Sequence, residues 1–175
     1  MEEKLKQLND CMTDHPDFPK PGIVFKNIMP LFSDPERMKL LGDVLEETIR
    51  EKFPGCTKLV GLESRGFLMG MAVASRLGVG FVPIRKKGKL PGEVVRQEYT
   101  LEYGTDVVEI EKASLEATDK IVLIDDLIAT GGTMKAAVKL IGSTEATLVG
   151  ALCLIEIDFL KGKEGIDNFV SLIHI

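Results

Sequence analysis

The chain has little of what several common classes of protein need. Its 175 residues include only three cysteines and two histidines. Cys11, Cys56 and Cys153 are odd in number and far apart, which argues against a disulfide framework or a zinc site. His15 and His174 have no candidate nucleophile near them in the sequence, so nothing indicates a Ser/His or Cys/His hydrolase.

Long apolar runs and excess positive charge are also missing. The longest apolar stretch, residues 146–155, is too short to cross a bilayer, and the first ten residues lack the apolar core of a signal peptide. A net charge of −5 argues against a general nucleic-acid binder. We therefore expect a cytoplasmic protein that has neither a nucleic acid nor a membrane as its partner.

What is present fits a single α/β domain. A hydrophobic content of 45% in 175 residues is enough for a sizeable core, and strand-like runs alternate with helix-like ones. We expect strands at 58–62, 80–84, 121–124, 148–157 and 169–173, a two-stranded excursion at 94–101 and 107–110, and helices at 67–77 and 134–141. Ser33 and Glu36 suggest a capping box at the start of a further helix, after a short N-terminal helix and a loop at 15–30. This order predicts a Rossmann-like core with a mainly parallel central sheet, flanking helices and an added flap.

The most informative segment is IVLIDDLIATGGT, residues 121–133, in which an apolar strand leads into two acids and then a loop of small residues before a helix. Ligands of open α/β sheets bind beyond the carboxyl ends of the strands. The loop can turn several backbone N–H groups toward one anion, and the helix dipole adds positive potential there. We expect a phosphate cradle formed by Ala129, Thr130, Gly131, Gly132 and Thr133.

The two acids, Asp125 and Asp126, suit sugar hydroxyls or a Mg²⁺ ion that bridges to further phosphate. A nucleoside-triphosphate P-loop is excluded, because Thr133 and Met134 follow the glycines where that motif needs a lysine. The remaining alternative from these residues alone is an ordinary strand-to-helix turn with solvated acids. The ligand expected here carries a phosphate, a diol and a polyphosphate bound to metal.

This segment resembles the phosphoribosyl-pyrophosphate (PRPP) loop of the type I phosphoribosyltransferases. Four more segments are similar to those of adenine phosphoribosyltransferases, in the same order: DFPKPGIVFKNIMP at 17–30, GLESRGF at 61–67, RKKGKLPG at 85–92 and YTLEYG at 99–104. The resemblance covers nearly the whole chain. It implies a type I phosphoribosyltransferase fold as one domain over residues 1–175, with a small N-terminal hood at 1–33 that binds the base and a flexible catalytic flap at 85–111.

The resemblance also implies which residues hold the diphosphate. Glu63, Ser64 and Arg65 lie where a strand meets a helix, and the family places its pyrophosphate loop there. Arg65 could bind a diphosphate in a bidentate manner. The basic segment after the strand at 80–84 could close as a lid over the leaving group, with Arg85, Lys86 and Lys89 as the ligands.

The base-binding and catalytic residues rest on the resemblance alone. It implies that Phe25 stacks on adenine with Leu160 on the other face, and that backbone groups of Val24 and Lys26 read the amino edge. A 6-oxopurine would mispair with a carbonyl that accepts from that amine. Glu102 is expected to face the base as a catalytic group, with Tyr103 completing the closed site and Arg65 assisting.

The expected reaction joins adenine and PRPP to give AMP and pyrophosphate, in a homodimer. Mg²⁺ would be held mainly by PRPP itself, with water-mediated contacts to Asp125 and Asp126. Two alternatives remain: transfer to guanine, hypoxanthine or xanthine, and a PRPP-sensing regulator, which should carry a DNA-binding segment or a damaged flap. One position departs from the family, because Asn27 stands where an aspartate is common.

Overall fold

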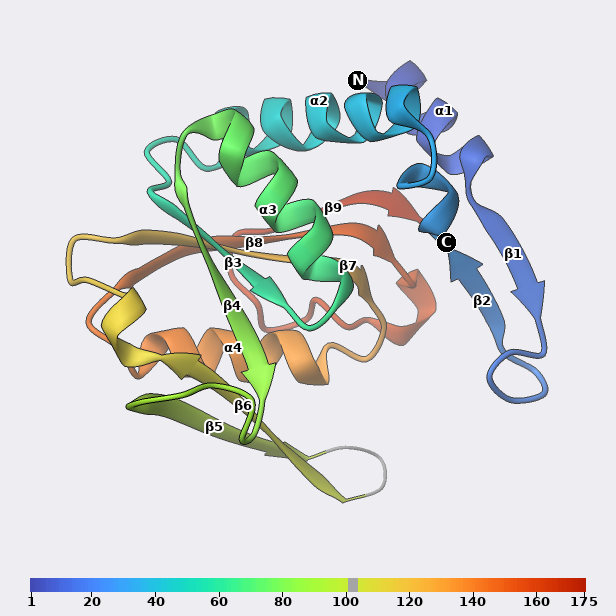
Figure 1. Cartoon of the computed structure of the whole chain (residues 1–175). Helices are drawn as coiled ribbons and strands as arrows, with labels where there is room; N and C mark the ends of the chain where they lie inside the picture. Colours follow the sequence, from blue (N-terminus) through green and yellow to red (C-terminus); the bar gives the residue numbers. More distant parts are fainter. Residues whose placement is uncertain (101–103) are drawn as a thin grey trace. The chain divides into compact units, whose positions relative to one another are not determined.

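The computed structural model describes residues 1–100 and 104–175, which divide into two compact units, residues 1–48 and 49–175 (Figure 1). The first contains α1 (Glu2–Cys11), β1 (Thr13–Pro16), β2 (Val24–Asn27), a 3-10 turn (Met29–Leu31) and most of α2 (Pro35–Lys52). None of the helices in the described part of the chain combines the length and apolarity needed to span a bilayer.

The expectation of an irregular loop over residues 15–30 is wrong at both ends. β1 and β2 form an antiparallel pair in which His15 lies opposite Phe25. The turn between them is closed by the Asp17 carboxylate, which accepts a hydrogen bond from the Gly22 backbone N–H at 2.7 Å. Gly22 has φ +86°, a conformation that favours glycine. Strand pairing satisfies backbone groups that a loop would leave to water.

The start of α2 also differs from expectation, because Asp34 caps it instead of Ser33. The Asp34 carboxylate accepts hydrogen bonds from the backbone N–H groups of Glu36 and Arg37, both at 3.0 Å. The Ser33 hydroxyl instead donates to the Pro30 carbonyl at 3.2 Å. A carboxylate at this position adds a favourable interaction with the helix dipole that a hydroxyl lacks.

The second unit is built on one sheet of seven strands in the order β5-β6-β4-β3-β7-β8-β9. β4, β3, β7, β8 and β9 run parallel, while β6 is antiparallel to β4 and to β5. The α/β fold with a mainly parallel sheet is confirmed. Its elements are β3 (Lys58–Leu62), α3 (Arg65–Leu77), β4 (Gly80–Lys86), β5 (Val94–Thr100), β6 (Thr105–Glu111), β7 (Lys120–Ile128), α4 (Gly132–Gly142), β8 (Thr147–Glu156) and β9 (Phe169–His174), with 3-10 turns at Lys112–Ser114 and Asp158–Leu160.

The connections place the sheet's switch point between β3 and β7. From β3 the chain passes through α3 to β4 on one side, and from β7 it passes through α4 to β8 on the other. Because parallel crossovers are right-handed, these opposite steps put α3 and α4 on opposite faces, as Figure 1 shows. The carboxyl ends of β3 and β7 therefore open into the crevice where such sheets bind ligands.

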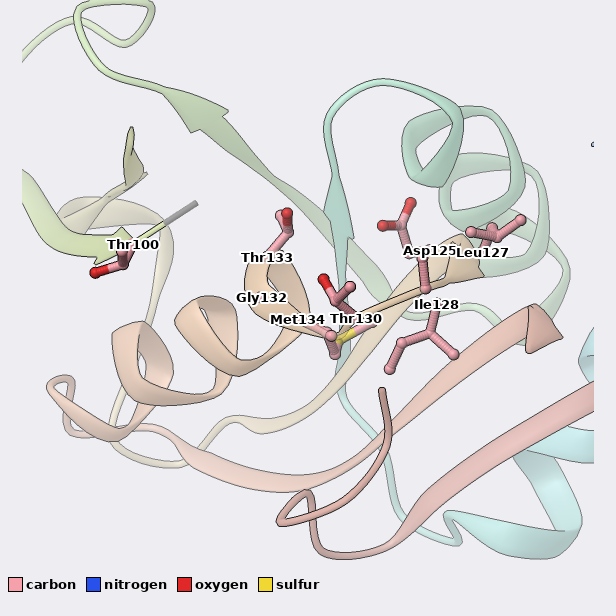
Figure 2. A pocket seen from close by; sticks show the side chains of 10 residues that line it. Thr100, Asp125, Leu127, Ile128, Thr130, Gly132, Thr133 and Met134 are labelled. Carbon is pink, nitrogen blue, oxygen red and sulfur yellow. The ribbon is translucent and has the colours of Figure 1, made fainter. Parts of the chain in front are cut away.

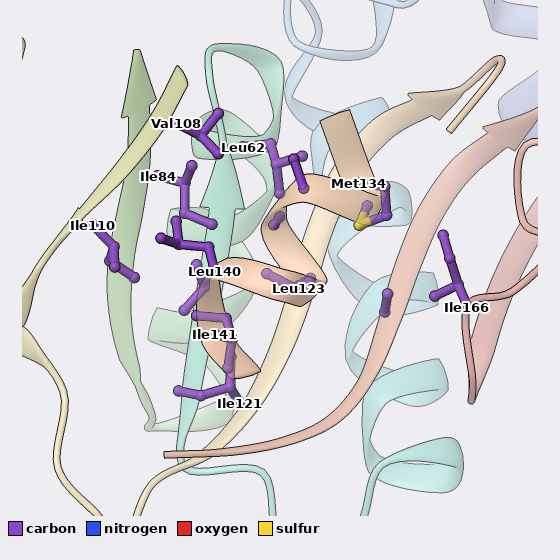
Figure 3. Packing of buried hydrophobic residues seen from close by; sticks show 14 of the residues in the cluster. Leu62, Ile84, Val108, Ile110, Ile121, Leu123, Met134, Leu140, Ile141 and Ile166 are labelled. Atoms are coloured by element: carbon purple, nitrogen blue, oxygen red, sulfur yellow. The ribbon is translucent and has the colours of Figure 1, made fainter. Parts of the chain in front are cut away.

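The main core lies between α4 and the sheet. Figure 3 shows Met134, Leu140 and Ile141 of α4 packed toward side chains of the strands. These strand residues are fully or almost fully buried and come from four strands, β3, β4, β6 and β7: Val60, Leu62, Val82, Ile84, Val108, Ile110, Ile121 and Leu123. The core fixes the axis of α4, and with it the loop that precedes the helix.

The other face of the sheet relies on glycine for close approach. A Cβ on Gly70 of α3 would lie 2.5 Å from the Phe81 ring and 2.9 Å from Ile124 Cγ2. Phe81 also fills the space above Gly61 of β3, at 2.8 Å from a Cβ built there. α3 therefore sits against the strands through an aromatic ring that two glycines accommodate.

We expect Gly70→Ala to destabilise the fold by about 1–3 kcal/mol, because the added methyl group overpacks the Phe81 ring. Urea unfolding of the variant and the wild type measures this difference. Gly142→Ala is the matched control, since nothing lies within 4 Å of a Cβ at Gly142. Equal unfolding free energies for Gly70→Ala and the wild type would contradict the packing described.

Candidate functional site

The strand that carries the two acids is longer than expected. β7 does not end at Ile124 but runs to Ile128, because β8 continues to pair with it, from Asp125 opposite Cys153 to Ile128 opposite Glu156. Successive side chains of a strand point to opposite faces. The two acids therefore belong to different faces of the sheet, although they are adjacent in the sequence.

Asp126 faces the start of α3 and forms an ion pair there. Its Oδ2 lies 2.5 Å from Nε of Arg65, and the carboxyl group is buried. Arg65 is the first residue of α3, and it is one of the residues predicted to bind a diphosphate. In this structure its guanidinium neutralises Asp126, so a charged pair stands at the mouth of the crevice.

Asp125 lines the same cavity as the loop that leads into α4, and its Oδ1 lies 3.2 Å from a Cβ built on Gly66 of α3. Burial raises the pKa of its carboxyl group well above the usual range, and the negative charge of Asp126 adds to the increase. Asp125 Oδ1 also accepts a hydrogen bond from the backbone N–H of Asp126 at 2.9 Å. A carboxyl group with a raised pKa next to an open cavity is typical of a functional position.

A cavity of about 640 Å³ lies beside this loop (Figure 2). Its lining brings Asp125 together with all five residues expected to cradle a phosphate. It also contains residues that the sequence did not suggest. The lining is Thr100, Asp125, Leu127, Ile128, Ala129, Thr130, Gly131, Gly132, Thr133 and Met134.

The loop leaves the first turn of α4 open to an anion. Gly131 adopts φ +82° and precedes the helix, and no side chain caps the helix there. The N–H groups of the first turn have no intrahelical acceptors, and no acidic residue lies in that turn. This geometry can bind a phosphate through backbone donors and the hydroxyls of Thr130 and Thr133.

A second ion pair, between Arg85 and Glu63, lies at the end of β4. Arg85 and Lys86 are the last residues of this strand instead of loop residues, because they pair with Glu109 and Val108 of β6. The Arg85 guanidinium donates two hydrogen bonds to the Glu63 carboxylate, at 3.1 and 3.3 Å. The hydrogen bond from Arg85 is the main reason that the pKa of Glu63 lies below its usual range.

Two acids that the sequence analysis does not predict, Glu109 and Asp106, bind the end of β4 and the basic segment after it. Glu109 is buried and accepts hydrogen bonds from the Gly88 backbone N–H at 2.9 Å and from Arg96 Nε at 2.7 Å. Asp106 lies 3.2 Å from the Lys86 ammonium group. Lys89 is exposed, and its backbone N–H donates to the Lys86 carbonyl at 3.2 Å.

Two expected catalytic residues, Glu102 and Tyr103, lie outside the described residues. The residue at the end of β5, Thr100, lines the cavity, and its carbonyl oxygen is 4.0 Å from a Cβ built on Gly132. The sequence motif YTLEYG begins at Tyr99, so it could have marked Thr100 as a site residue.

The residues expected to bind the base belong to both units, so their common pocket stays a prediction. Val24, Phe25 and Lys26 form most of β2 in the first unit, where Lys26 pairs with Asp14 at 2.9 Å. Leu160 ends a 3-10 turn of the second unit and is partly exposed.

The unusual Asn27 has a local structural role. Its Oδ1 accepts a hydrogen bond from the Met29 backbone N–H at 3.0 Å, which an aspartate could also do. Its amide group also donates to the Thr13 hydroxyl at 3.4 Å, so it links the ends of β1 and β2. Asparagine therefore supports the pair of strands without a negative charge.

Comparison with known proteins gives one consistent family. Residues 31–169 match the model of the phosphoribosyl transferase domain. The chain is 46% identical to the adenine phosphoribosyltransferase of Francisella philomiragia, over 94% of both chains. It is 48% identical to that of Rhodospirillum rubrum, over 90% of this chain and 91% of the other.

Solved structures agree with these sequence matches. The Saccharomyces cerevisiae adenine phosphoribosyltransferase, complexed with an imino-altritol bisphosphate and adenine, has a TM-score of 0.95 and 40% identity, with 98% of this chain and 99% of that chain covered. The Trypanosoma brucei enzyme, in complex with AMP, pyrophosphate and ribose-5-phosphate, has a TM-score of 0.86 and 31% identity, with 98% of this chain and 79% of that chain covered.

We expect Arg85→Gln to raise the pKa of Glu63 toward its usual value, because the guanidinium group that stabilises the carboxylate is lost. A pH titration followed by NMR of ¹³C-labelled glutamate carboxyl groups measures it. Arg96→Gln is the matched control, since Arg96 pairs with Glu109 and not with Glu63. A Glu63 titration that is the same in Arg85→Gln and wild type would show that the pair does not exist in solution.

Proposed function

The chain belongs to the adenine phosphoribosyltransferase family, and from that premise we propose that it transfers the phosphoribosyl group of PRPP to adenine, giving AMP and pyrophosphate. The observation that carries this proposal is the uncapped first turn of α4 beside the cavity that Asp125 lines. This arrangement offers a phosphate site and a carboxyl group within one pocket.

The ribose 5-phosphate half of the substrate would bind along the loop before α4. Backbone N–H groups and hydroxyls from Ala129, Thr130, Gly131, Gly132 and Thr133 would hold the 5′-phosphate. The Asp125 carboxyl group would bind ribose hydroxyls, with Asp126 completing the pair of acids. In their ionised form, these carboxylates would also stabilise the positive charge that develops on the ribose during transfer.

The diphosphate would bind cationic side chains, of which Arg65, Arg85 and Lys86 pair with acids in this structure. We propose that it binds near Glu63, Ser64 and Arg65, with Arg85, Lys86 and Lys89 supplying positive charge. The ion pair between Arg85 and Glu63 keeps the guanidinium oriented before the ligand arrives. Such groups would neutralise the pyrophosphate as it leaves.

A Mg²⁺ ion would suit this site. Carboxylate oxygens are the protein ligands that Mg²⁺ prefers. Asp125 presents such oxygens in the cavity that residues 129–133, the proposed phosphate loop, also line. Magnesium supplies charge neutralisation to a diphosphate leaving group. We propose that PRPP itself holds most of the metal's coordination sphere, with Asp125 and Asp126 contacting it through water.

Binding and activation of the base rest on the family resemblance. Phe25 and Leu160 are proposed to contact the adenine ring, and the backbone of Val24 and Lys26 to read its amino edge. Glu102 is proposed to polarise the purine while a ring nitrogen attacks the ribose, with Tyr103 beside it. Support comes from the position of Glu102 in the sequence, two residues after Thr100, which lines the cavity.

We also propose that the enzyme is a cytoplasmic homodimer that works as one phosphoribosyltransferase domain. Leu68 and Met71 of α3 are exposed apolar residues next to Phe67, Phe81 and Pro83, and a second copy of the chain could cover this surface. Cys11, Cys56 and Cys153 are free thiols, which suits a reducing compartment.

Turnover with competing purines tests the proposal. With PRPP and Mg²⁺, we expect adenine to be converted to AMP at a kcat/KM at least about 100-fold above those for guanine, hypoxanthine and xanthine, since a carbonyl acceptor that pairs with the amine would face the 6-oxo group. Chromatographic separation of the nucleotide products measures the ratio. Preference for a 6-oxopurine would replace adenine as the acceptor, and the absence of transfer with every purine would support a binding protein instead.

Glu102→Gln tests the proposed catalytic group. We expect kcat to fall by about 100-fold or more, because proton transfer or polarisation by a positioned side chain contributes on this scale, while PRPP affinity stays close to that of the wild type. Steady-state rates and isothermal titration with PRPP measure the two quantities. Glu98→Gln is the control, since Glu98 lies on β5 among the described residues and does not line the cavity. An unchanged kcat in Glu102→Gln would remove this residue from the mechanism.

A further inference from the structure

The phosphate loop, residues 129–133, is in close contact with a turn from a distant part of the chain, residues 157–163. A Cβ built on Gly131 would lie 2.0 Å from the carbonyl oxygen of Gly162. A Cβ built on Gly162 would lie 2.2 Å from the carbonyl oxygen of Ala129 and 2.9 Å from Ile128 Cγ1. Because such distances are too short for real atoms, the two backbones can meet only while both positions are glycine.

The same turn is attached to the end of β7. The backbone N–H of Ile157 donates to the carbonyl oxygen of Ile128 at 3.0 Å. Ile128 is the last residue of β7 and directly precedes the phosphate loop. The loop is therefore held at its start by a hydrogen bond and at its centre by the contact with Gly162.

A buried acid fixes the far side of this turn. Glu156 is only 2% exposed, and its carboxylate lies 3.1 Å from the Lys163 ammonium group and accepts a hydrogen bond from the Ser171 hydroxyl. Asp158 at the start of the turn lies 2.8 Å from His174 Nδ1. Glu156, Asp158 and His174 are close enough together to hold a metal ion, but the Lys163 ammonium group already neutralises Glu156.

We propose that Gly162 is a positioning residue for the phosphate loop, and that the ion pair between Glu156 and Lys163 holds it in place. The turn keeps the loop in the conformation that aims its N–H groups at the 5′-phosphate. Leu160 lies in the same turn, so the loop that binds the phosphoribosyl donor and the residue assigned to the base are mechanically linked. This inference rests on the proposed function, because it assumes that the loop binds the 5′-phosphate.

The test is the affinity of Gly162→Ala for ribose 5-phosphate, measured by isothermal titration. We expect the Kd to rise roughly 10- to 100-fold, because displacing Ala129 misaligns donors to a charged group. Gly142→Ala is the matched control, since it adds the same methyl group where nothing lies within 4 Å, and its Kd should equal that of the wild type. A loss of overall stability alone would lower the melting temperature without changing the Kd of the folded protein.

A wild-type Kd in a folded Gly162→Ala variant would overturn the inference. Failure of the wild type itself to bind ribose 5-phosphate would instead count against the proposed function, so the two failures are distinguishable. If Gly162→Ala does not fold, Lys163→Gln makes the same test without touching the backbone, and we expect its Kd to rise at least about threefold, since a buried carboxylate loses its partner. Lys161→Gln, an exposed lysine of the same turn, removes the same charge and should leave the Kd unchanged; equal effects of both lysine variants would reject the anchor.

Discussion

The geometry of the site depends on where β7 loses one of its two neighbours. β3 pairs with β7 only as far as Ile124, whereas β8 pairs with it to Ile128. Over these last residues β7 is held in register from one side and open on the other, where α3 begins. Gly66 allows that approach, because a Cβ there would lie 2.6 Å from the Ile124 carbonyl oxygen. The crevice and the exit point of the phosphate loop both follow from this unequal pairing.

Cationic side chains of the candidate site already form ion pairs with carboxylates of the protein. Arg65 pairs with Asp126, Arg85 with Glu63, and Lys86 with Asp106. A ligand that recruits these cations must compete with carboxylates that already hold them, so binding exchanges one set of ion pairs for another. Weakly charged anions gain little from such an exchange, whereas a diphosphate with a bound metal brings enough charge and enough donors and acceptors to compete.

Much of the fold could be predicted from the sequence, because apolar periodicity and glycine positions are local signals. The helix predicted at 67–77 is an example, because α3 ends at Leu77 and the glycine that follows it, Gly78, adopts φ +71°. The features that were missed depend on distant residues. Aspartate is unfavourable in strands, so the sequence predicts that the strand ends before Asp125 and Asp126. In the structure β7 continues past both residues, because β8 pairs with it. The pairing of Arg85 with Glu63 and the contact of Gly131 with Gly162 join segments that are far apart in the chain, and no local pattern reports them.

The position of β5 has a consequence for how the protein behaves at high concentration. β5 is the outermost strand of the sheet, paired with β6 on one side only among the described residues, so its other edge could add a strand from a second molecule. Arg96 and Glu98 are exposed on this strand. Charged side chains along an edge oppose the stacking of chains into extended sheets, because each new strand would have to bury them. The sequence of β5 therefore disfavours aggregation through a strand that borders the cavity.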